Sequence, residues 1–153
     1  PVGNKGLVIE KVDGPSHLKV VEEFGYEMYM HCGAIRKVLL AWQTPAFIDE
    51  YFKNIILHDQ AFPHVRPDDL REELKKIRQD GYAITHGEYV TDALGIGAPV
   101  FNSDGELAGS IGIIAPEIRV DTPEFLDTQK DLVQFYASSL SADLGYEKHD
   151  VFQ

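Results

Sequence analysis

His31 and Cys32 are the first residues whose types could support catalysis. They are neighbours in the sequence and directly precede a predicted helix that begins near Gly33. A cysteine near a helix N-terminus has a lowered thiol pKa, which favours the nucleophilic thiolate. Adjacent residues of an extended segment point to opposite faces, however, and this separates a nucleophile from its base. We therefore expect Cys32 to be a buried structural residue, with a cysteine-dependent enzyme as the alternative.

A metal site is the second chemical possibility. His86 and Glu88 would lie on the same face of one strand, and His31 could supply a third ligand. None of the six histidines has the helical spacing with glutamate that is typical of zinc hydrolases. We expect no metal and no other cofactor, and His31, His86 and Glu88 are the candidate ligands of a metal-enzyme alternative.

Arg36 is an unusual residue for its position, because it lies on the first turn of an otherwise apolar helix beside Ile35 and Val38. A guanidinium near a helix N-terminus favours a bound carboxylate, since both its donor geometry and the helix dipole attract an anion. The alternative is that Arg36 points to solvent or pairs with a surface acid. The sequence leaves both interpretations open.

Glycines are concentrated on two predicted strands, at Gly95, Gly97, Gly109 and Gly112. Their spacing is not that of a phosphate-binding loop, and they do not lead directly into a helix, so an anion cradle is not expected. Small residues on adjacent strands leave a volume that either a ligand or a closely packed element fills. The pattern does not decide between these two.

Five strands and four helices are predicted to position these residues. The strands cover residues 7–12, 18–21, 82–90, 95–101 and 106–114, with a hairpin turn at 102–105. The helices begin at Gly33, Thr44-Pro45, Arg66-Pro67 and Thr122-Pro123, and a loop spans residues 58–65. This order favours an α+β fold in which helices flank an antiparallel sheet.

Composition limits the classes of function. The 153 residues fit one globular domain, which we expect over residues 1–146 with a tail at 147–153. A net charge of −11 opposes direct binding of nucleic acid, and no apolar run is long enough to span a membrane. Cys32 is the only cysteine, so we expect no intrachain disulfide and a location in the reducing cytoplasm.

A series of short motifs gives the sequence a family resemblance. They are Ile9 to Pro15, His31, Lys37, Leu40-Ala41, Gly81-Tyr82-Ala83, Gly87-Glu88, Gly95, Ala98 to Phe101, Asp104-Gly105, Ala115-Pro116 and Leu140 to Tyr146. In this order they resemble the effector-binding domain of IclR-type transcriptional regulators, over almost the whole chain.

The resemblance implies a GAF-like fold, which is a curved antiparallel sheet with helices on both faces. It implies a sensor of a small metabolite, often a carboxylate or an aromatic acid, that forms homodimers or homotetramers. The family binds DNA through an N-terminal winged helix-turn-helix, which we expect, with its linker helix, to lie outside this chain. A metal or cysteine-dependent enzyme and an oligomerisation module without a ligand are the alternatives.

The resemblance also implies a pocket between the sheet and the loop that leads into the first helix. By motif, its lining would be His17, Val20, Met28, Ala34, Ile35, Thr85, Ala93, Gly95, Gly112 and Ile114. Arg36 is a further candidate, at a position where the family usually has glycine. Family members often have hydroxyl residues near Gly33 and Gly112, so we expect this pocket to be poorer in hydroxyl groups, and larger.

Overall fold

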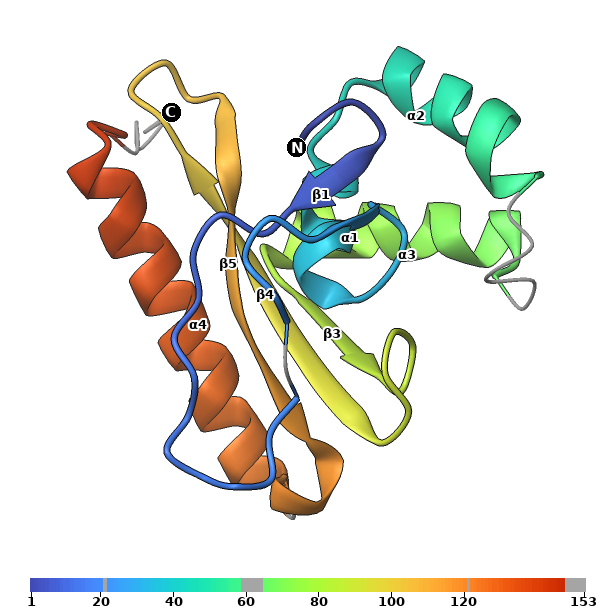
Figure 1. The fold of residues 1–153 in the computed structure, drawn as a ribbon. Helices are drawn as coiled ribbons and strands as arrows, with labels where there is room; N and C mark the ends of the chain where they lie inside the picture. Colours follow the sequence, from blue (N-terminus) through green and yellow to red (C-terminus); the bar gives the residue numbers. More distant parts are fainter. Residues whose placement is uncertain (21, 59–64, 121, 148–153) are drawn as a thin grey trace.

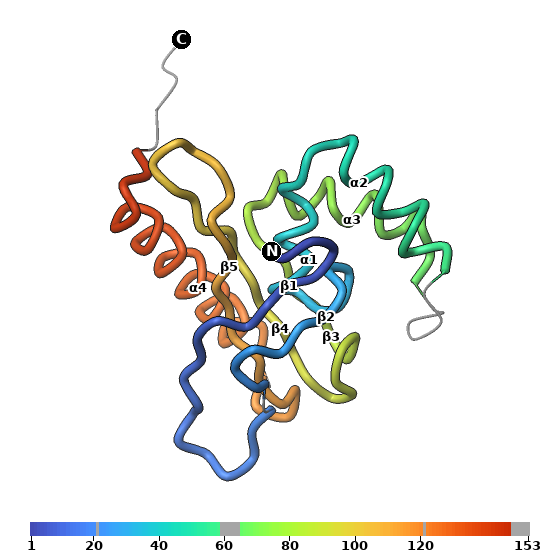
Figure 2. The backbone as a smooth tube through the Cα atoms, turned by 45° about the horizontal axis from the view of Figure 1, so that its top comes forward, coloured from blue at the N-terminus to red at the C-terminus, as the bar shows by residue number. Residues whose placement is uncertain are grey.

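The computed structural model describes residues 1–20, 22–58, 65–120 and 122–147, which form a sheet between two helical layers (Figure 1). Helix α4 (Pro123–Asp143) lies on one face of the sheet, and helix α1 (Ala34–Ala41) lies on the other. Helices α2 (Pro45–Tyr51) and α3 (Pro67–Asp80) extend the layer of α1, as Figure 2 also shows. The predicted α+β arrangement, with helices on both faces of an antiparallel sheet, is confirmed.

The main sheet has the order β3-β4-β5 and is antiparallel throughout. Its strands are β3 (Ala83–His86), β4 (Ala93–Phe101) and β5 (Leu107–Pro116). The β4–β5 hairpin closes at the predicted turn, where Asn102 Oδ1 accepts hydrogen bonds from the backbone N–H groups of Asp104 and Glu106, both at 3.0 Å. The register pairs Gly97 with Gly112 and Thr85 with Gly95.

Strand β3 is shorter than the predicted strand over residues 82–90. It ends at His86, and a turn with positive φ at Gly87 (62°) and Asp92 (58°) connects it to β4. An L-residue rarely adopts a positive φ, so the glycine favours this turn over a longer strand. As a result, Glu88 lies in the turn and not on the strand face where strand alternation would place it.

The two faces of β4 differ because side chains alternate along a strand. Leu94, Ile96 and Val100 form one buried cluster with Val133 and Ala137 of α4. The intervening positions, which include Gly95 and Gly97, face the first turn of α1. A second buried cluster joins α1 to α2 and α3 and is separate from the first.

The predicted helix signals are confirmed at several ends. Thr44 and Thr122 cap α2 and α4 through their hydroxyl oxygens, which accept hydrogen bonds of 3.2 Å from the N–H groups of Phe47 and Phe125. Helix α3 ends at Gly81, which has a left-handed conformation with φ of 78°. A π-helical turn, η1 (Phe52–Ile56), continues α2, and a 3-10 turn, η2 (Glu117–Arg119), follows β5.

The N-terminal part differs most from the prediction. Its two strands are β1 (Lys5–Leu7) and β2 (Glu27–Tyr29), which pair with each other in a sheet separate from the main one. The predicted strand over residues 7–12 is therefore wrong beyond Leu7, and residues 18–20 of the second predicted strand are also irregular. The connection between β1 and β2, over the described residues 8–20 and 22–26, contains no helix or strand. Val21, residues 59–64 of the predicted loop and residues 148–153 of the predicted tail lie outside the described residues.

Candidate functional site

Helix α1 begins very close to the sheet, and the glycines of β4 permit this approach. A Cβ atom at Gly95 would lie 3.0 Å from Thr85 Oγ1 and 3.4 Å from Ala34 Cβ, and a Cβ at Gly97 would lie 2.7 Å from Ile35 Cα. Thr85 Oγ1 accepts a hydrogen bond of 3.1 Å from the Ala34 N–H, which fixes the start of the helix on β3. The main chain at Gly33 has φ of 80°, so this entry to the helix also favours glycine.

Gly112 separates the two interpretations of the glycine pattern. A Cβ at this position would collide with the Ile96 carbonyl oxygen and would lie 2.6 Å from Ile35 Cγ1. At Gly97 and Gly112 the small residues therefore make room for the first turn of α1 and not for a ligand. Gly109 differs, because a Cβ there would meet no heavy atom within 4 Å.

A small cavity lies beside Gly95, between the start of α1, the ends of β3 and β4, and the turn that joins them. Its volume is about 20 Å³, which is room for about one water molecule. It is lined by Gly33, Ala34, Ile35, Arg36, Thr85, Glu88, Tyr89, Val90, Ala93, Leu94, Gly95 and Ile114. This arrangement of the chain leaves only a small cavity there, and the pocket larger than in other family members stays a prediction.

Seven of the predicted pocket residues line this cavity, namely Ala34, Ile35, Arg36, Thr85, Ala93, Gly95 and Ile114. Gly112 packs on Ile35 instead, while His17, Val20 and Met28 are not among the lining residues. His17 is exposed, and Met28 belongs to β2. The sheet of β1 and β2 is separate from the main sheet, so these residues do not reach the cavity beside Gly95. No sequence pattern pointed to Tyr89 and Val90, since their positions depend on the turn after His86.

Arg36 is a wall of the cavity and is almost completely buried, with 5% of its surface exposed. Its Nη2 donates to both carboxylate oxygens of Glu22, each at 3.0 Å, and the Glu22 side chain is only 12% exposed. The guanidinium carbon lies 5.0 Å from the ring centre of Tyr89 and 5.9 Å from that of Tyr26. Arg36 is thus among the lining residues of the cavity, and its partner is the largely buried Glu22 and not a fully exposed acid.

Tyr89 shares this environment. Burial raises the pKa of the Tyr89 hydroxyl well above its ordinary value, and the Tyr26 hydroxyl and the Glu22 carboxylate raise it further, while Arg36 lowers it. Tyr89 therefore keeps its proton at any physiological pH. A neutral phenol beside a guanidinium is a hydrogen-bond donor that does not repel an anion.

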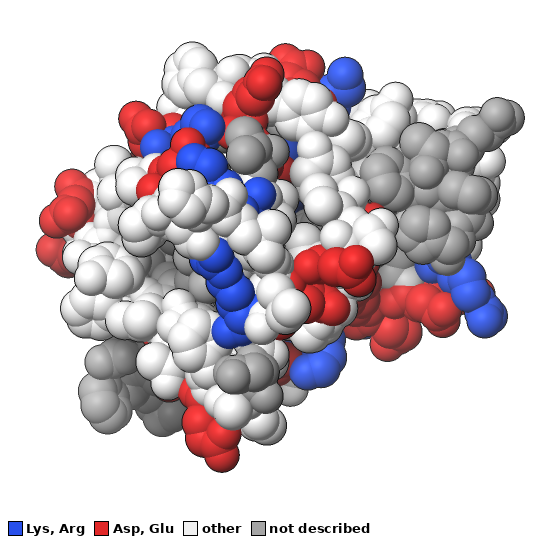
Figure 3. Space-filling view, turned by 60° about the horizontal axis from the view of Figure 1, so that its bottom comes forward, with Lys and Arg blue, Asp and Glu red and all other residues white. Residues whose placement is uncertain are grey.

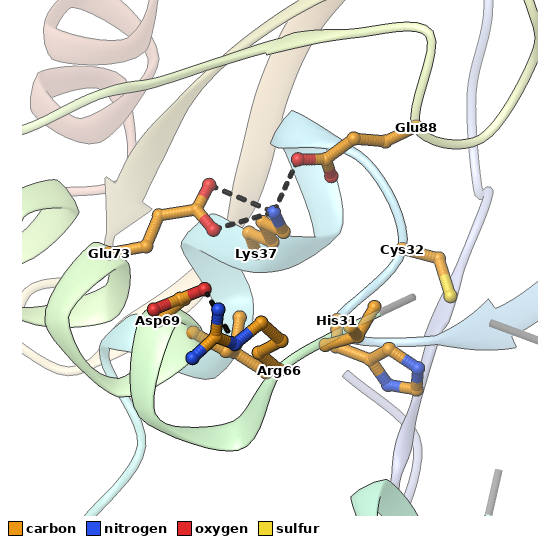
Figure 4. Close-up of a pocket in the computed structure, with 9 residues that line it drawn as sticks. His31, Cys32, Lys37, Arg66, Asp69, Glu73 and Glu88 are labelled. Carbon is orange, nitrogen blue, oxygen red and sulfur yellow. Dashed lines mark hydrogen bonds and ion pairs between the residues drawn. The ribbon is translucent and has the colours of Figure 1, made fainter. Parts of the chain in front are cut away.

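A second, more polar cavity of about 160 Å³ lies between α1 and α3 (Figure 4). Lys37 projects into it, with its Nζ 2.7 Å from Glu73 Oε2 and 2.7 Å from Glu88 Oε1. Arg66 and Asp69 form an exposed ion pair at its rim, at 3.4 Å. Glu88 lines both cavities, so the turn after β3 connects the wall of the first cavity to Lys37.

His31 and Cys32 also border this second cavity, and both are buried. His31 Nδ1 lies 2.8 Å from the Tyr51 hydroxyl, which holds the imidazole against α2. The expectation that Cys32 is a buried residue is confirmed. The expected separation of the two side chains by strand alternation does not apply, because β2 ends at Tyr29 and His31 and Cys32 are not part of a strand.

The proposed metal ligands are not brought together. His86 is largely exposed and its Nδ1 lies 3.0 Å from Glu117 Oε1, on the side of the sheet that carries α4, whereas His31 is held by Tyr51 on the α1 side. Within residues 1–20, 22–58, 65–120 and 122–147, no three His, Cys, Asp or Glu side chains are placed to hold a metal ion. The arrangement of His31, His86 and Glu88 as a metal site is therefore wrong, because Glu88 is directed to Lys37.

A third hollow, of about 410 Å³, is an open groove at the start of α4. It is lined by His86, Leu94, Glu117, Val120, Thr122, Pro123 and Leu126. The three hollows differ in character, because only the smallest contains a nearly buried guanidinium. On the face in Figure 3, Lys and Arg side chains lie among acidic ones and do not gather in one broad patch.

The family to which the chain belongs follows from comparison with known proteins. The family model described as the bacterial transcriptional regulator IclR C-terminal domain matches residues 2–142. The chain belongs to the IclR family. Its fold is the GAF-like fold of IclR C-terminal domains, as the resemblance implied, and it is a regulatory domain of transcriptional regulators.

Individual relatives agree with this assignment. The chain is 30% identical over 141 residues to the uncharacterised HTH-type transcriptional regulator RhmR of Escherichia coli K12, covering 91% of this chain and 54% of RhmR. It is 26% identical over 145 residues to the HTH-type regulator KipR of Bacillus subtilis 168, covering 94% of this chain and 58% of KipR. The chain thus spans little more than half the length of these two relatives.

A solved structure supports the same fold. The crystal structure of Thermotoga maritima IclR superposes with a TM-score of 0.84 at 28% identity, covering 95% of this chain and 59% of that protein. The relatives reported above carry the names of transcriptional regulators, which agrees with a regulatory and not an enzymatic domain. Among the described residues, no helix combines the length and apolar character that crossing a bilayer requires.

Proposed function

We propose that this IclR domain senses a small carboxylic acid, which binds at the cavity between the first turn of α1 and the turn that joins β3 to β4. The observation that carries the proposal is the buried guanidinium of Arg36, which lines the cavity. Arginine binds carboxylates through parallel N–H donors, and a nearly dry site strengthens that interaction. The Tyr89 hydroxyl and the first turn of α1 supply further donors nearby.

The cavity must open before an acid of several heavy atoms can enter, because it now has room for about one water molecule. One of its walls comes from a connection and not from the sheet, namely the turn with Glu88, Tyr89 and Val90. The β1–β2 connection lies next to the cavity, because its residues Glu22 and Tyr26 contact the lining residue Arg36. A ligand that binds only the open arrangement shifts the population toward it.

The response would be transmitted to DNA by a helix-turn-helix segment outside this chain. The HTH-type names of RhmR and KipR, and the coverage of little more than half of their lengths, support this proposal. The net charge of −11 gives this domain no electrostatic advantage on a phosphate backbone. A cytoplasmic location follows from the same role.

We also propose that the domain acts as a homodimer or homotetramer. Large apolar side chains are exposed on the outer side of α4, where Phe135 is 64% and Tyr136 is 57% exposed. Exposed apolar patches of this kind are typical of surfaces that bind another protein. Light scattering after size exclusion should give more than one chain per particle, and Phe135→Glu should lower that mass. A strictly monomeric wild type would contradict the proposal.

Calorimetric titration tests the sensor proposal. The probes are pyruvate, benzoate and gluconate, which represent keto, aromatic and sugar acids. At least one should bind the wild type, and Arg36→Gln should lose that binding while Arg71→Gln retains it, because Arg71 is an exposed residue paired with Asp49. Equal binding to the wild type and to Arg36→Gln would place the acid elsewhere, for example in the groove beside His86.

A further inference from the structure

The ion pair between Arg36 and Glu22 occupies the position where an acidic ligand would meet the guanidinium. Glu22 presents a carboxylate to Arg36 with both oxygens at 3.0 Å, and the two side chains are 6% and 12% exposed. A small acid would offer the same group to the same donors. The protein thus already contains a carboxylate at its own candidate carboxylate site.

The geometry of this pair is not the strongest that arginine can form. Both contacts go to one nitrogen, Nη2, whereas a guanidinium has five N–H donors and binds a carboxylate best through two nitrogens. A free acid is not restrained by a chain and can adopt the two-nitrogen geometry. It can therefore compete with Glu22, although Glu22 has the advantage of a high local concentration.

Within its described residues, the segment that carries Glu22 contacts Tyr89 and Arg36 through Tyr26 but buries few apolar side chains. Its apolar side chains are mostly exposed: Ile9 is 71%, Val12 is 94% and Phe24 is 71% exposed, so their burial contributes little to hold it. The hydrogen bonds from Val8 N–H to the Tyr26 carbonyl and from Gly25 N–H to the Val8 carbonyl lie at its base, next to β1 and β2. The largely buried carboxylate of Glu22 and the ring of Tyr26 both contact Arg36 of α1.

We infer that Glu22 is a built-in competitor for the effector, and that an acid binds by replacing Glu22 on Arg36 and releasing the connection between β1 and β2. This inference rests on the proposed function, because it assigns a mechanism to the same site. Release of Glu22 frees the guanidinium of Arg36, a lining residue of the cavity, to hold the acid. It also explains the ligand class, because a neutral molecule has no charge with which to replace the carboxylate.

Replacement of Glu22 by an acid would change the restraint on the β1–β2 connection, whereas binding in a preformed pocket would leave that connection in place. The β1–β2 pair closes the released connection, from Lys5 opposite Tyr29 to Leu7 opposite Glu27. The start of the chain leads directly into β1. Binding on Arg36 would therefore alter the restraint on the N-terminal end of the domain.

Glu22→Gln tests the inference, because it removes the charge and keeps the shape. Its matched control is Glu23→Gln, an exposed acid on the same segment. Pyruvate, benzoate and gluconate are titrated into the wild type and both variants by calorimetry, with benzamide as a neutral probe. Glu22→Gln should bind the acids at least about tenfold more tightly than the wild type, and Glu23→Gln should match the wild type. Benzamide has no charge to pair with Arg36 and should bind none of the three measurably.

Hydrogen–deuterium exchange without any ligand provides an independent measurement. Amides of the connection between β1 and β2 should exchange faster in Glu22→Gln than in the wild type, and a thermal scan confirms that the variant is folded. If exchange in this segment is unchanged, Glu22 does not hold it and the inference fails whether or not an acid binds.

The titrations separate the inference from the proposed function. If an acid binds the wild type and Glu22→Gln with equal affinity, the sensor remains and the built-in competitor is wrong. If the acids bind only Glu22→Gln, Glu22 blocks the site but the wild type does not sense these acids, and the sensor proposal is wrong for them. If no acid binds either protein, the sensor of carboxylates is wrong and the exchange mechanism fails with it.

Discussion

The two faces of the main sheet are built from different chemistry. On one face, Leu94, Ile96 and Val100 pack on α4 in an apolar cluster. On the other, glycines bring α1 close to β4, and the helix carries the buried charges of Arg36 and Lys37. Apolar burial supplies most folding free energy, whereas buried charges depend on well-placed partners. The apolar face of α4 therefore stabilises the fold, as does the cluster of α1 with α2 and α3. The face of α1 also carries buried charges, and we expect it to be the face that responds to a ligand.

The largest effect is expected from a cavity on the α4 face. Ile96 is completely buried in the cluster with α4, so Ile96→Ala should lower the free energy of unfolding by about 2–5 kcal/mol. Chemical denaturation measures this value. Ile118→Ala is the control, since Ile118 is 80% exposed, and its loss should stay within about 0.5 kcal/mol. A small loss at Ile96 would mean that the α4 face does not carry the stability.

A smaller loss of stability is expected at the site where α1 approaches the sheet. Gly97→Ala would bring a Cβ to 2.7 Å from Ile35 Cα, so it should destabilise the fold by about 1–3 kcal/mol. Gly109→Ala is the matched control on the neighbouring strand, where a Cβ meets nothing within 4 Å. It should be neutral or slightly stabilising, because alanine restricts the unfolded chain. Equal thermal shifts for the two variants would contradict the close approach of α1.

The hydroxyl that fixes the start of α1 should contribute a similar or smaller free energy of unfolding. Thr85→Val keeps the shape but removes the acceptor of the Ala34 N–H, and an unsatisfied buried donor costs about 1–3 kcal/mol. Thr85→Ser keeps the acceptor and should lose less stability than Thr85→Val in the same denaturation series. The reverse order would show that the methyl group, and not the hydrogen bond, holds the helix.

The smallest effect is expected at Lys37, which has two carboxylate partners. Glu73→Gln leaves Glu88 bound to Lys37, and the Glu73 side chain is 35% exposed, so the loss should be about 1 kcal/mol or less. Glu72→Gln, an exposed acid on the same helix, serves as the control. A loss above that of Thr85→Val would mean that the ion pairs hold α1 more strongly than its contact with the sheet does.

Sequence patterns predicted the parts of the fold that local chemistry determines. The Thr-Pro pairs at Thr44 and Thr122 and the left-handed Gly81 mark helix ends in the structure, and Asn102 marks the β4–β5 turn. The strand predicted beyond Leu7 is wrong because strand formation depends on a distant partner and not on local chemistry. A β-branched segment becomes a strand only when another strand pairs with it, and residues 8–12 have no strand partner in the described structure.

The candidate site was predictable in part. Resemblance to the IclR family pointed to Ala34, Thr85 and Gly95, which form the junction of α1 with the sheet. The partner of Arg36 could not be found in this way, because Glu22 lies 14 residues away in an irregular segment with no periodic pattern. Tyr89 was missed because its direction depends on the turn after His86 and not on strand alternation.

Hydrogen–deuterium exchange of the two faces, with and without a bound acid, would show which face of the sheet responds to the ligand. With saturating pyruvate, benzoate or gluconate, whichever binds, amides at the start of α1 and in the turn of residues 87–92 should gain protection. Amides of α4 should be unchanged in the same experiment. Protection confined to α4 and the groove beside His86 would contradict this division of roles, because the ligand would then bind the face that we assign to stability.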